Sequence, residues 1–168
     1  MEHYQGDAYQ DQLLLRWWGT MYQANEIVPI LGERHLRLAQ FFAAFQAPTQ
    51  LFYAADEMDI TIACWFDPSP LQAAFFSVWV CPAWRGSRRG LGVVLDALNA
   101  GFTEFRLPAI ILVTNDEKIQ RLHAHLGATH CGTIPGIYAG QDARISYITA
   151  DVFPDICARF HRTAVVAA

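Results

Sequence analysis

Apolar residues recur at helical spacing near the start of the chain. The first stripe consists of Leu14, Trp17, Trp18 and Met21. Their spacing of i, i+3, i+4 and i+7 predicts an amphipathic helix over Tyr9 to Gln23. The same spacing recurs from Glu33 to Phe45 and predicts a second helix, which Pro29 and Gly32 separate from the first. The chain is therefore expected to begin with two helices, and no strand is evident before them.

Three apolar segments rich in β-branched and aromatic residues follow these helices. They are Leu51 to Ala55, Ile60 to Phe66 and Ala73 to Val80. Short turn-like sequences separate them, which predicts three strands. Because loops this short usually join antiparallel neighbours, the three strands are expected to pair in that way.

The second half of the chain predicts alternating helices and strands. An apolar stripe from Leu91 to Phe105 indicates a helix, and the continuous apolar run Ala109 to Val113 is typical of a strand buried on both faces. This order of strand, helix and strand implies one parallel crossover. The remaining predicted elements are a helix over Asp116 to Leu126, strands around Thr129 to Ile134 and Arg144 to Thr149, and a helix near Pro154 to His161. The prediction is an α/β (α+β) fold with a mixed, mostly antiparallel central sheet flanked by helices.

Composition narrows the class of protein. The chain has 168 residues, of which 53% are hydrophobic and 17% are charged, so it can bury a sizeable core as one domain over residues 1–168. The formal net charge of −4 argues against a general nucleic-acid binder, which needs an excess of cations. The acidic N-terminal residues form no signal peptide, and no apolar run is long enough to span a membrane. A soluble cytoplasmic protein is therefore expected.

Cysteine and histidine spacing does not indicate a metal site. Cys64, Cys81, Cys131 and Cys157 are widely separated, so free buried thiols are expected. His125 and His130 lie near each other in sequence, but no carboxylate spacing completes a set of ligands. No metal is predicted.

Arginines gather at one place in the chain. Lys118 is the single lysine among twelve basic residues, and three of the eleven arginines lie in residues 80–92, which read VCPAWRGSRRGLG. This segment connects a predicted strand to a predicted helix. Glycines let backbone N–H groups turn toward a ligand, and the start of the helix adds further donors, so the segment suits a phosphate or pyrophosphate. It lacks the Gly-Lys-Ser/Thr of a P-loop and the third glycine of a dinucleotide fingerprint.

This segment resembles the hallmark of the GNAT superfamily of acetyl-CoA-dependent N-acetyltransferases, V-x-P-x-x-R-G-x-G-x-G/A. Five residues match in register: Val80, Pro82, Arg85, Gly86 and Gly90. Arg88 departs from the pattern, because the family usually has glycine at that position. A second alignment, in which Gly90 and Gly92 form the functional pair across a local insertion, stays open.

A second segment is similar to the same family. Residues 115–128, NDEKIQRLHAHLGA, resemble the element N-x-x-A-x-x-L-Y-x-x-L-G-F, with Leu122, Leu126 and Gly127 in place. The resemblance covers roughly Leu51 to Thr149 with the order of elements intact.

The resemblance implies where acetyl-CoA binds. In this family the fourth and fifth strands splay apart around the pantetheine arm. Carried over, the backbone of Val78 and Val80 would bind the arm, and Asn115 or Asp116 would meet the arm or the amine, although Asp116 equally suits a helix N-cap. The pyrophosphate would lie on the loop, and one of its arginines would reach the 3′-phosphate. The implied cofactor-binding residues of the loop are Arg85, Gly86, Ser87, Arg88, Arg89, Gly90 and Gly92.

His123 is the candidate catalytic residue, since it stands where the family commonly has a tyrosine that protonates the CoA thiolate. A pKa near 6.5 would allow proton transfer at neutral pH, whereas the apolar stripe around His123 favours a packing role. No general base is assigned, because the fourth strand offers only Ser77, and Asp67 and Glu57 fall in predicted turns.

Two functions follow from the resemblance. The first is an N-acetyltransferase that transfers acetyl from acetyl-CoA to a small-molecule or peptide amine by direct attack. The alternative is a non-catalytic GNAT-like structural or interaction module, with or without CoA binding. The loop Pro135 to Asp142 is expected to help select the acceptor, and the helical N-terminus with the apolar tail Ala164 to Ala168 indicates a homodimer contact.

Overall fold

The chain divides into two compact units in the computed structural model, which describes residues 1–46, 49–69, 72–138 and 141–165. The first unit comprises Met1–Asp67 and Ser77–Ala97, and the second comprises Pro68–Phe76 and Leu98–Ala168. The strands β3 (Asp59–Pro68) and β4 (Ala74–Val80) and the helix α4 (Arg88–Thr103) contribute residues to both units. Residues 139–140 of the expected acceptor loop Pro135 to Asp142 and residues 166–168 of the expected apolar contact Ala164 to Ala168 lie outside the described residues.

Within the described residues the strands form a seven-stranded mixed sheet in the order β1-β2-β3-β4-β5-β7-β6. The strands are β1 (Glu2–His3), β2 (Gln50–Asp56), β3 (Asp59–Pro68), β4 (Ala74–Val80), β5 (Ala109–Thr114), β6 (Thr129–Tyr138) and β7 (Gln141–Thr149). β4 pairs with β5 in parallel, and the pairs β1–β2, β2–β3, β5–β7 and β6–β7 are antiparallel. The predicted fold class, a mostly antiparallel sheet with one parallel crossover, is confirmed.

Helices flank this sheet. The α-helices are α1 (Ala8–Gln23), α2 (Ile27–Leu31), α3 (Leu38–Ala44), α4 (Arg88–Thr103), α5 (Glu117–His125) and α6 (Phe153–Val165), and the 3₁₀ turns are η1 (Glu33–Leu36) and η2 (Pro82–Trp84). The first helix agrees with its prediction within one residue. Its N-cap is Asp7, whose carboxylate accepts a hydrogen bond from the Gln10 amide at 2.8 Å.

The predicted second helix, Glu33 to Phe45, is wrong as a single element. Gly32 has a φ of +91°, which ends α2, and Arg37 is extended with ψ 122°, which separates η1 from α3. The sequence pattern does not predict α2, because Pro29 is typical of a helix break. Pro29 lies in the first turn of α2. Backbone N–H groups of the first turn make no hydrogen bond within a helix, so a proline there costs none.

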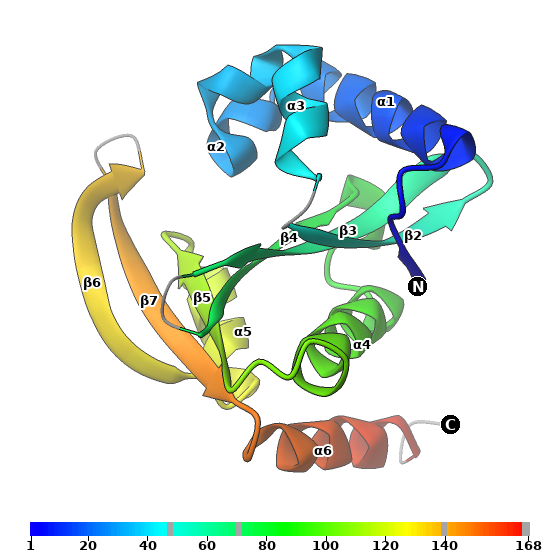
Figure 1. The fold of residues 1–168 in the computed structure, drawn as a ribbon. Coiled ribbons are helices and arrows are strands. Elements are labelled where there is room, and N and C mark those ends of the chain that lie inside the picture. The colour runs from blue at the N-terminus through cyan, green and yellow to red at the C-terminus, as the bar shows by residue number, and fades with distance from the viewer. Residues whose placement is uncertain (47–48, 70–71, 139–140, 166–168) are drawn as a thin grey trace. The chain divides into compact units, whose positions relative to one another are not determined.

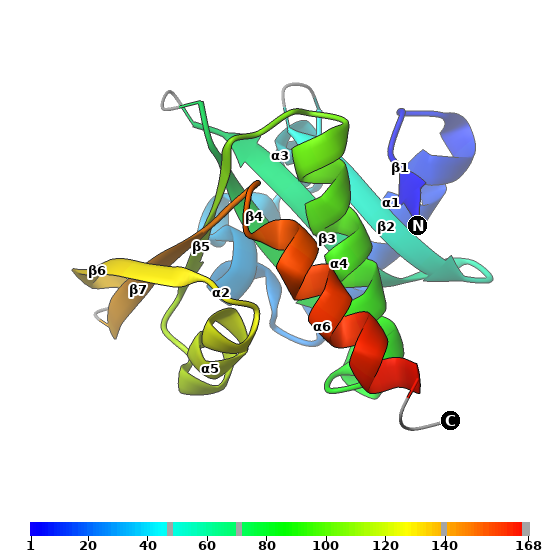
Figure 2. The same cartoon turned by 90° about the horizontal axis from the view of Figure 1, so that it is seen from below.

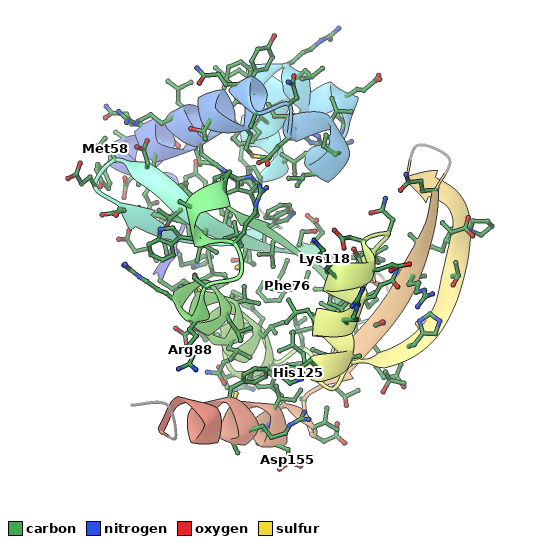
Figure 3. All side chains as sticks on the ribbon, turned by 180° about the vertical axis from the view of Figure 1, so that it is seen from behind. Met58, Phe76, Arg88, Lys118, His125 and Asp155 are labelled. Atoms are coloured by element: carbon green, nitrogen blue, oxygen red, sulfur yellow. The ribbon has the colours of Figure 1, made fainter. Side chains whose placement is uncertain are left out.

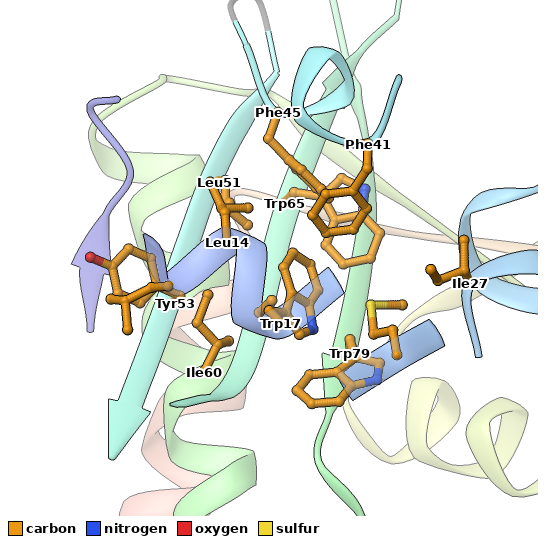
Figure 4. Packing of buried hydrophobic residues seen from close by; sticks show 13 residues of the cluster. Leu14, Trp17, Ile27, Phe41, Phe45, Leu51, Tyr53, Ile60, Trp65 and Trp79 are labelled. Atoms are coloured by element: carbon orange, nitrogen blue, oxygen red, sulfur yellow. The ribbon is translucent and has the colours of Figure 1, made fainter. Parts of the chain in front are cut away.

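The core of the first unit is aromatic (Figure 4). Trp17 of α1 is 1% exposed, and its ring centroid lies 5.2 to 6.2 Å from those of its aromatic neighbours. These neighbours are Phe41, Phe45, Trp65 and Trp79. Such packing fixes α1 and α3 on one face of β2, β3 and the end of β4 (Figure 1).

The second unit contains a long curved hairpin of β6 and β7 (Figure 1). Both strands extend beyond their predicted ends, so most of the expected acceptor loop Pro135 to Asp142 is strand instead. A bulge between Ile134 and Tyr138 accommodates Gly136, whose φ is +68°. The helix α6 follows β7 at the end of the chain (Figure 2). It begins at Phe153, whose ring centroid lies 4.9 Å from that of Phe102 in α4.

The two-residue strand β1 also corrects the sequence analysis, which found no strand ahead of the helices. Glu2 pairs with Tyr53 and His3 with Phe52. Two residues are too short for a periodic signal, and the pairing depends on long-range contacts. The phenol of Tyr53 donates a hydrogen bond to the Glu2 carboxylate at 2.7 Å, which fixes the strand to β2.

Candidate functional site

The segment between β4 and α4 has the geometry of an anion-binding loop. The turn η2 carries the chain from β4 to Gly86, whose φ of +75° suits glycine. Ser87 then caps α4, because its hydroxyl accepts a hydrogen bond from the Gly90 amide at 3.0 Å. In the described part of the chain, no hydrogen bond uses the backbone N–H groups of Gly86, Arg88 and Arg89. These three donors and the positive end of a 16-residue helix are available to an anion.

Gly90 and Gly92 have different surroundings. A Cβ atom on Gly90 would lie 3.1 Å from the carbonyl oxygen of Trp84 and 3.2 Å from the Ser87 hydroxyl. The absence of a side chain therefore lets α4 begin close against the η2 turn. A Cβ atom on Gly92 would meet nothing within 4 Å. The loop thus leaves little room for a side chain at position 90 and open space for one at position 92.

Arg88, the departure from the family pattern, does not distort the loop. It is the first residue of α4 and is exposed on the outside of the helix (Figure 3). It is not among the residues with positive φ, so its backbone needs no glycine. Arg89 is also exposed, and its guanidinium carbon lies 4.0 Å from the ring centroid of Trp84 in a cation–π contact.

Arg85 is occupied within the protein. Its Nε donates to the carbonyl oxygen of Val80 at 2.9 Å, and its Nη2 donates to Oε1 of Glu26 at 2.5 Å. The other carboxylate oxygen of Glu26 accepts from the Trp79 indole N–H at 2.7 Å. Glu26 is the important residue that sequence reasoning missed. It lies 59 positions from Arg85, and no local pattern signals a pair at that distance.

The end of β4 is an open strand edge in the first unit. The registered parallel pairs with β5 are Ala74, Phe75 and Phe76, although β4 continues to Val80. The Cys81 amide donates to Thr61 of β3 at 2.8 Å. Because backbone groups alternate along a strand, the N–H groups of Val78 and Val80 point away from β3. The registered ladder with β5 thus ends at Phe76.

The second unit carries the other candidate residues. Asp116 is the N-cap of α5, where it accepts from the Lys118 amide at 2.6 Å and the Ile119 amide at 3.4 Å, so the cap interpretation is confirmed. Asn115 donates its side-chain amide to Gln141 at 2.8 Å. Binding of a ligand by Asn115 stays a prediction.

His123 does not have the expected pKa. It lies half-buried on α5, and burial lowers its pKa from 6.5 to about 4. The ring is therefore neutral at pH 7, which weakens the acid role, and the catalytic role of His123 stays a prediction. Among the residues considered as a base, Asp67 accepts a hydrogen bond from Thr49 at 3.0 Å, and Glu57 lies in the β2–β3 turn with a φ of +53°.

The following statements hold for the described residues. No disulfide joins the cysteines there; Cys64 is buried as expected, whereas Cys131 is exposed. No group of three or more His, Cys, Asp and Glu side chains is placed to hold a metal in those ranges. None of the described helices has the length and apolar character that a membrane span requires.

The fold is shared with several solved structures. Solved structures with this fold include point mutants of the spermidine N-acetyltransferase SpeG from Vibrio cholerae. One has a TM-score of 0.65 and 14% identity, covering 91% of this chain and 97% of its own, and another has a TM-score of 0.65 and 15% identity, covering 81% and 90%. The spermidine/spermine N-acetyltransferase SpeG of the same organism matches with a TM-score of 0.61 at 17% identity over 70% and 76% of the two chains.

The chain thus has the GNAT fold, as the sequence motifs predicted. At these identities the likeness defines the fold and leaves the reaction to be tested. No family model matches the sequence, and no curated protein matches it either.

Proposed function

We propose that this protein is an acyl-CoA-dependent N-acetyltransferase, with acetyl-CoA as cosubstrate and an amine as acceptor. The observation that carries the proposal is the loop between β4 and α4, on a fold shared with N-acetyltransferases. Its unpaired amides at Gly86, Arg88 and Arg89 suit the pyrophosphate of CoA. The exposed guanidinium groups of Arg88 and Arg89 would meet the 3′-phosphate.

The end of β4 supports the second part of the proposal. The N–H groups of Val78 and Val80 lie on the open strand edge, beyond the last registered pair with β5. One of them would hydrogen-bond the pantetheine arm or the thioester carbonyl. A backbone donor held in place on a strand needs no reorganisation to stabilise the oxyanion that forms as the amine attacks. The carbon–sulfur bond then breaks and CoA leaves as the thiolate, which takes up a proton, while the amine loses one.

The alternative is a GNAT-like module that binds CoA without transferring acetyl. One observation favours it: His123, the proposed proton donor, is neutral at pH 7 because burial lowers its pKa to about 4. The described residues of β4 also include no carboxylate that would act as a base.

Calorimetric titration with acetyl-CoA and CoA, followed by a thiol-release assay, separates these functions. The amine panel includes spermidine and spermine, because the structural neighbours are named for acetylating them, together with a peptide amine. Binding with thiol release supports the enzyme. Binding without release for any amine supports the module, and the absence of binding contradicts both.

A further inference from the structure

The carboxylate of Glu26 is hydrogen-bonded beside the proposed anion-binding loop, although an anion site does not itself need a negative charge there. Its side chain is 18% exposed, and both carboxylate oxygens accept hydrogen bonds, one from Arg85 and one from Trp79. Trp79 is 2% exposed and packs against Trp17, so the carboxylate is fixed to the core of the first unit. Glu26 itself stands at the corner between α1 and α2, where its amide donates to Met21 at 2.9 Å.

Arg85 connects this fixed carboxylate to the loop. One guanidinium edge holds the Val80 carbonyl at the end of β4, and another nitrogen holds Glu26. The next residue, Gly86, carries the first of the unpaired amides. A planar guanidinium with two directional bonds restricts where residue 85 lies, and therefore where the Gly86 amide points. A negative charge beside a proposed phosphate site is unfavourable by simple electrostatics, so its presence calls for another role.

We propose that Glu26 is a positioning residue for the CoA loop, which acts by holding the Arg85 guanidinium between its carboxylate and the Val80 carbonyl. Arg85 orients the loop through these bonds and is not the residue that contacts phosphate. The inference rests on the proposed function, since the loop that is oriented is the proposed CoA site.

Glu26→Gln tests this proposal through the direction in which the affinity for CoA changes. The variant removes the charge and keeps an oxygen to accept from Trp79, so the fold is retained. Loss of positioning weakens CoA binding by about tenfold, the size expected when one charge-assisted hydrogen bond is lost. If Glu26 were only a nearby negative charge, or if it withheld Arg85 from the phosphates, the same change would strengthen binding. Glu33→Gln, an exposed carboxylate of η1, is the matched control and leaves affinity nearly unchanged.

Arg85 variants separate positioning from direct contact with phosphate. Arg85→Lys keeps the charge but cannot hold two partners in the guanidinium geometry. If Arg85 acts by positioning, Arg85→Lys and Arg85→Gln weaken CoA binding equally. The double variant Glu26→Gln with Arg85→Gln then binds CoA no more weakly than the weaker-binding of the two single variants. Retained affinity in Arg85→Lys together with additive losses in the double variant overturns the inference.

Titration calorimetry with CoA at two salt concentrations measures these effects, and thermal unfolding checks that each variant is folded. A positioning loss persists at high salt, whereas a lost phosphate contact shrinks as salt screens it. Wild-type protein that fails to bind CoA contradicts the proposed function and this inference with it. Wild-type binding that Glu26→Gln leaves unchanged or strengthens contradicts this inference alone.

Discussion

Replacing Gly86 by alanine tests the geometry of the loop, with Gly92→Ala as the matched control. Gly86 has a φ of +75°, and an added Cβ would meet nothing within 4 Å. Backbone strain is therefore the only way in which the alanine side chain destabilises the folded state. An alanine in this left-handed region costs about 1–2 kcal/mol. Reduced freedom of the unfolded chain returns about 0.4–1 kcal/mol, which leaves a net loss of about 1 kcal/mol.

Gly92 lies inside α4 with open space around its Cβ position and no positive φ. Alanine there gains helix propensity, about 0.5–1 kcal/mol. For a chain of this size, 1 kcal/mol corresponds to about 2–4 °C in Tm. Thermal unfolding should therefore show a lower Tm for Gly86→Ala and a higher Tm for Gly92→Ala than for the wild type. Gly86→Asn should recover part of the loss, because asparagine tolerates the left-handed region. A Tm for Gly86→Ala equal to or above that of the wild type would refute this description of the loop.

Three further predictions concern other parts of the site. Asp116→Ala removes the cap that accepts two amides of α5, so denaturant unfolding should show a loss of about 1 kcal/mol, and an unchanged midpoint contradicts the cap. His123 has a pKa lowered by burial to about 4, so the unfolded chain binds the extra proton and stability falls as pH drops from about 6.5 to about 4. Between pH 7 and pH 5 the free energy of unfolding should decrease less in His123→Phe than in the wild type. Equal decreases in the two proteins contradict the burial of His123. Arg88→Gln should weaken CoA binding at low salt more than at high salt, whereas an equal loss at both contradicts a charge contact.

Strong periodicity is what made much of the fold predictable. The helix α1 and the strands β2 to β5 have long apolar patterns with clear turn signals, and each was predicted within about two residues. The segment after α1 was not, because Gly32 and Arg37 adopt backbone angles that break one apolar stripe into three short elements. Likewise, β6 runs on through Pro135 and Gly136, residues that sequence patterns assign to loops.

The parts of the site that are formed by residues close together in sequence were predictable. The glycines, serine and arginines of the β4–α4 connection lie within eight residues, so their pattern alone indicates an anion-binding loop. The partner of Arg85 comes from the distant α1–α2 corner, and the environment that lowers the pKa of His123 arises only on folding. Such pairings and burial depend on tertiary structure, which is why Arg85 was expected among the phosphate ligands.

Competition between CoA, dephospho-CoA and pantetheine measures the central claim most directly. The loop is proposed to bind the pyrophosphate, which CoA and dephospho-CoA share and pantetheine lacks. The account predicts that both nucleotides bind in calorimetric titrations, that dephospho-CoA is the weaker, and that pantetheine neither binds comparably nor displaces CoA. Pantetheine that binds as tightly as CoA, or CoA that does not bind at all, would contradict the proposed site.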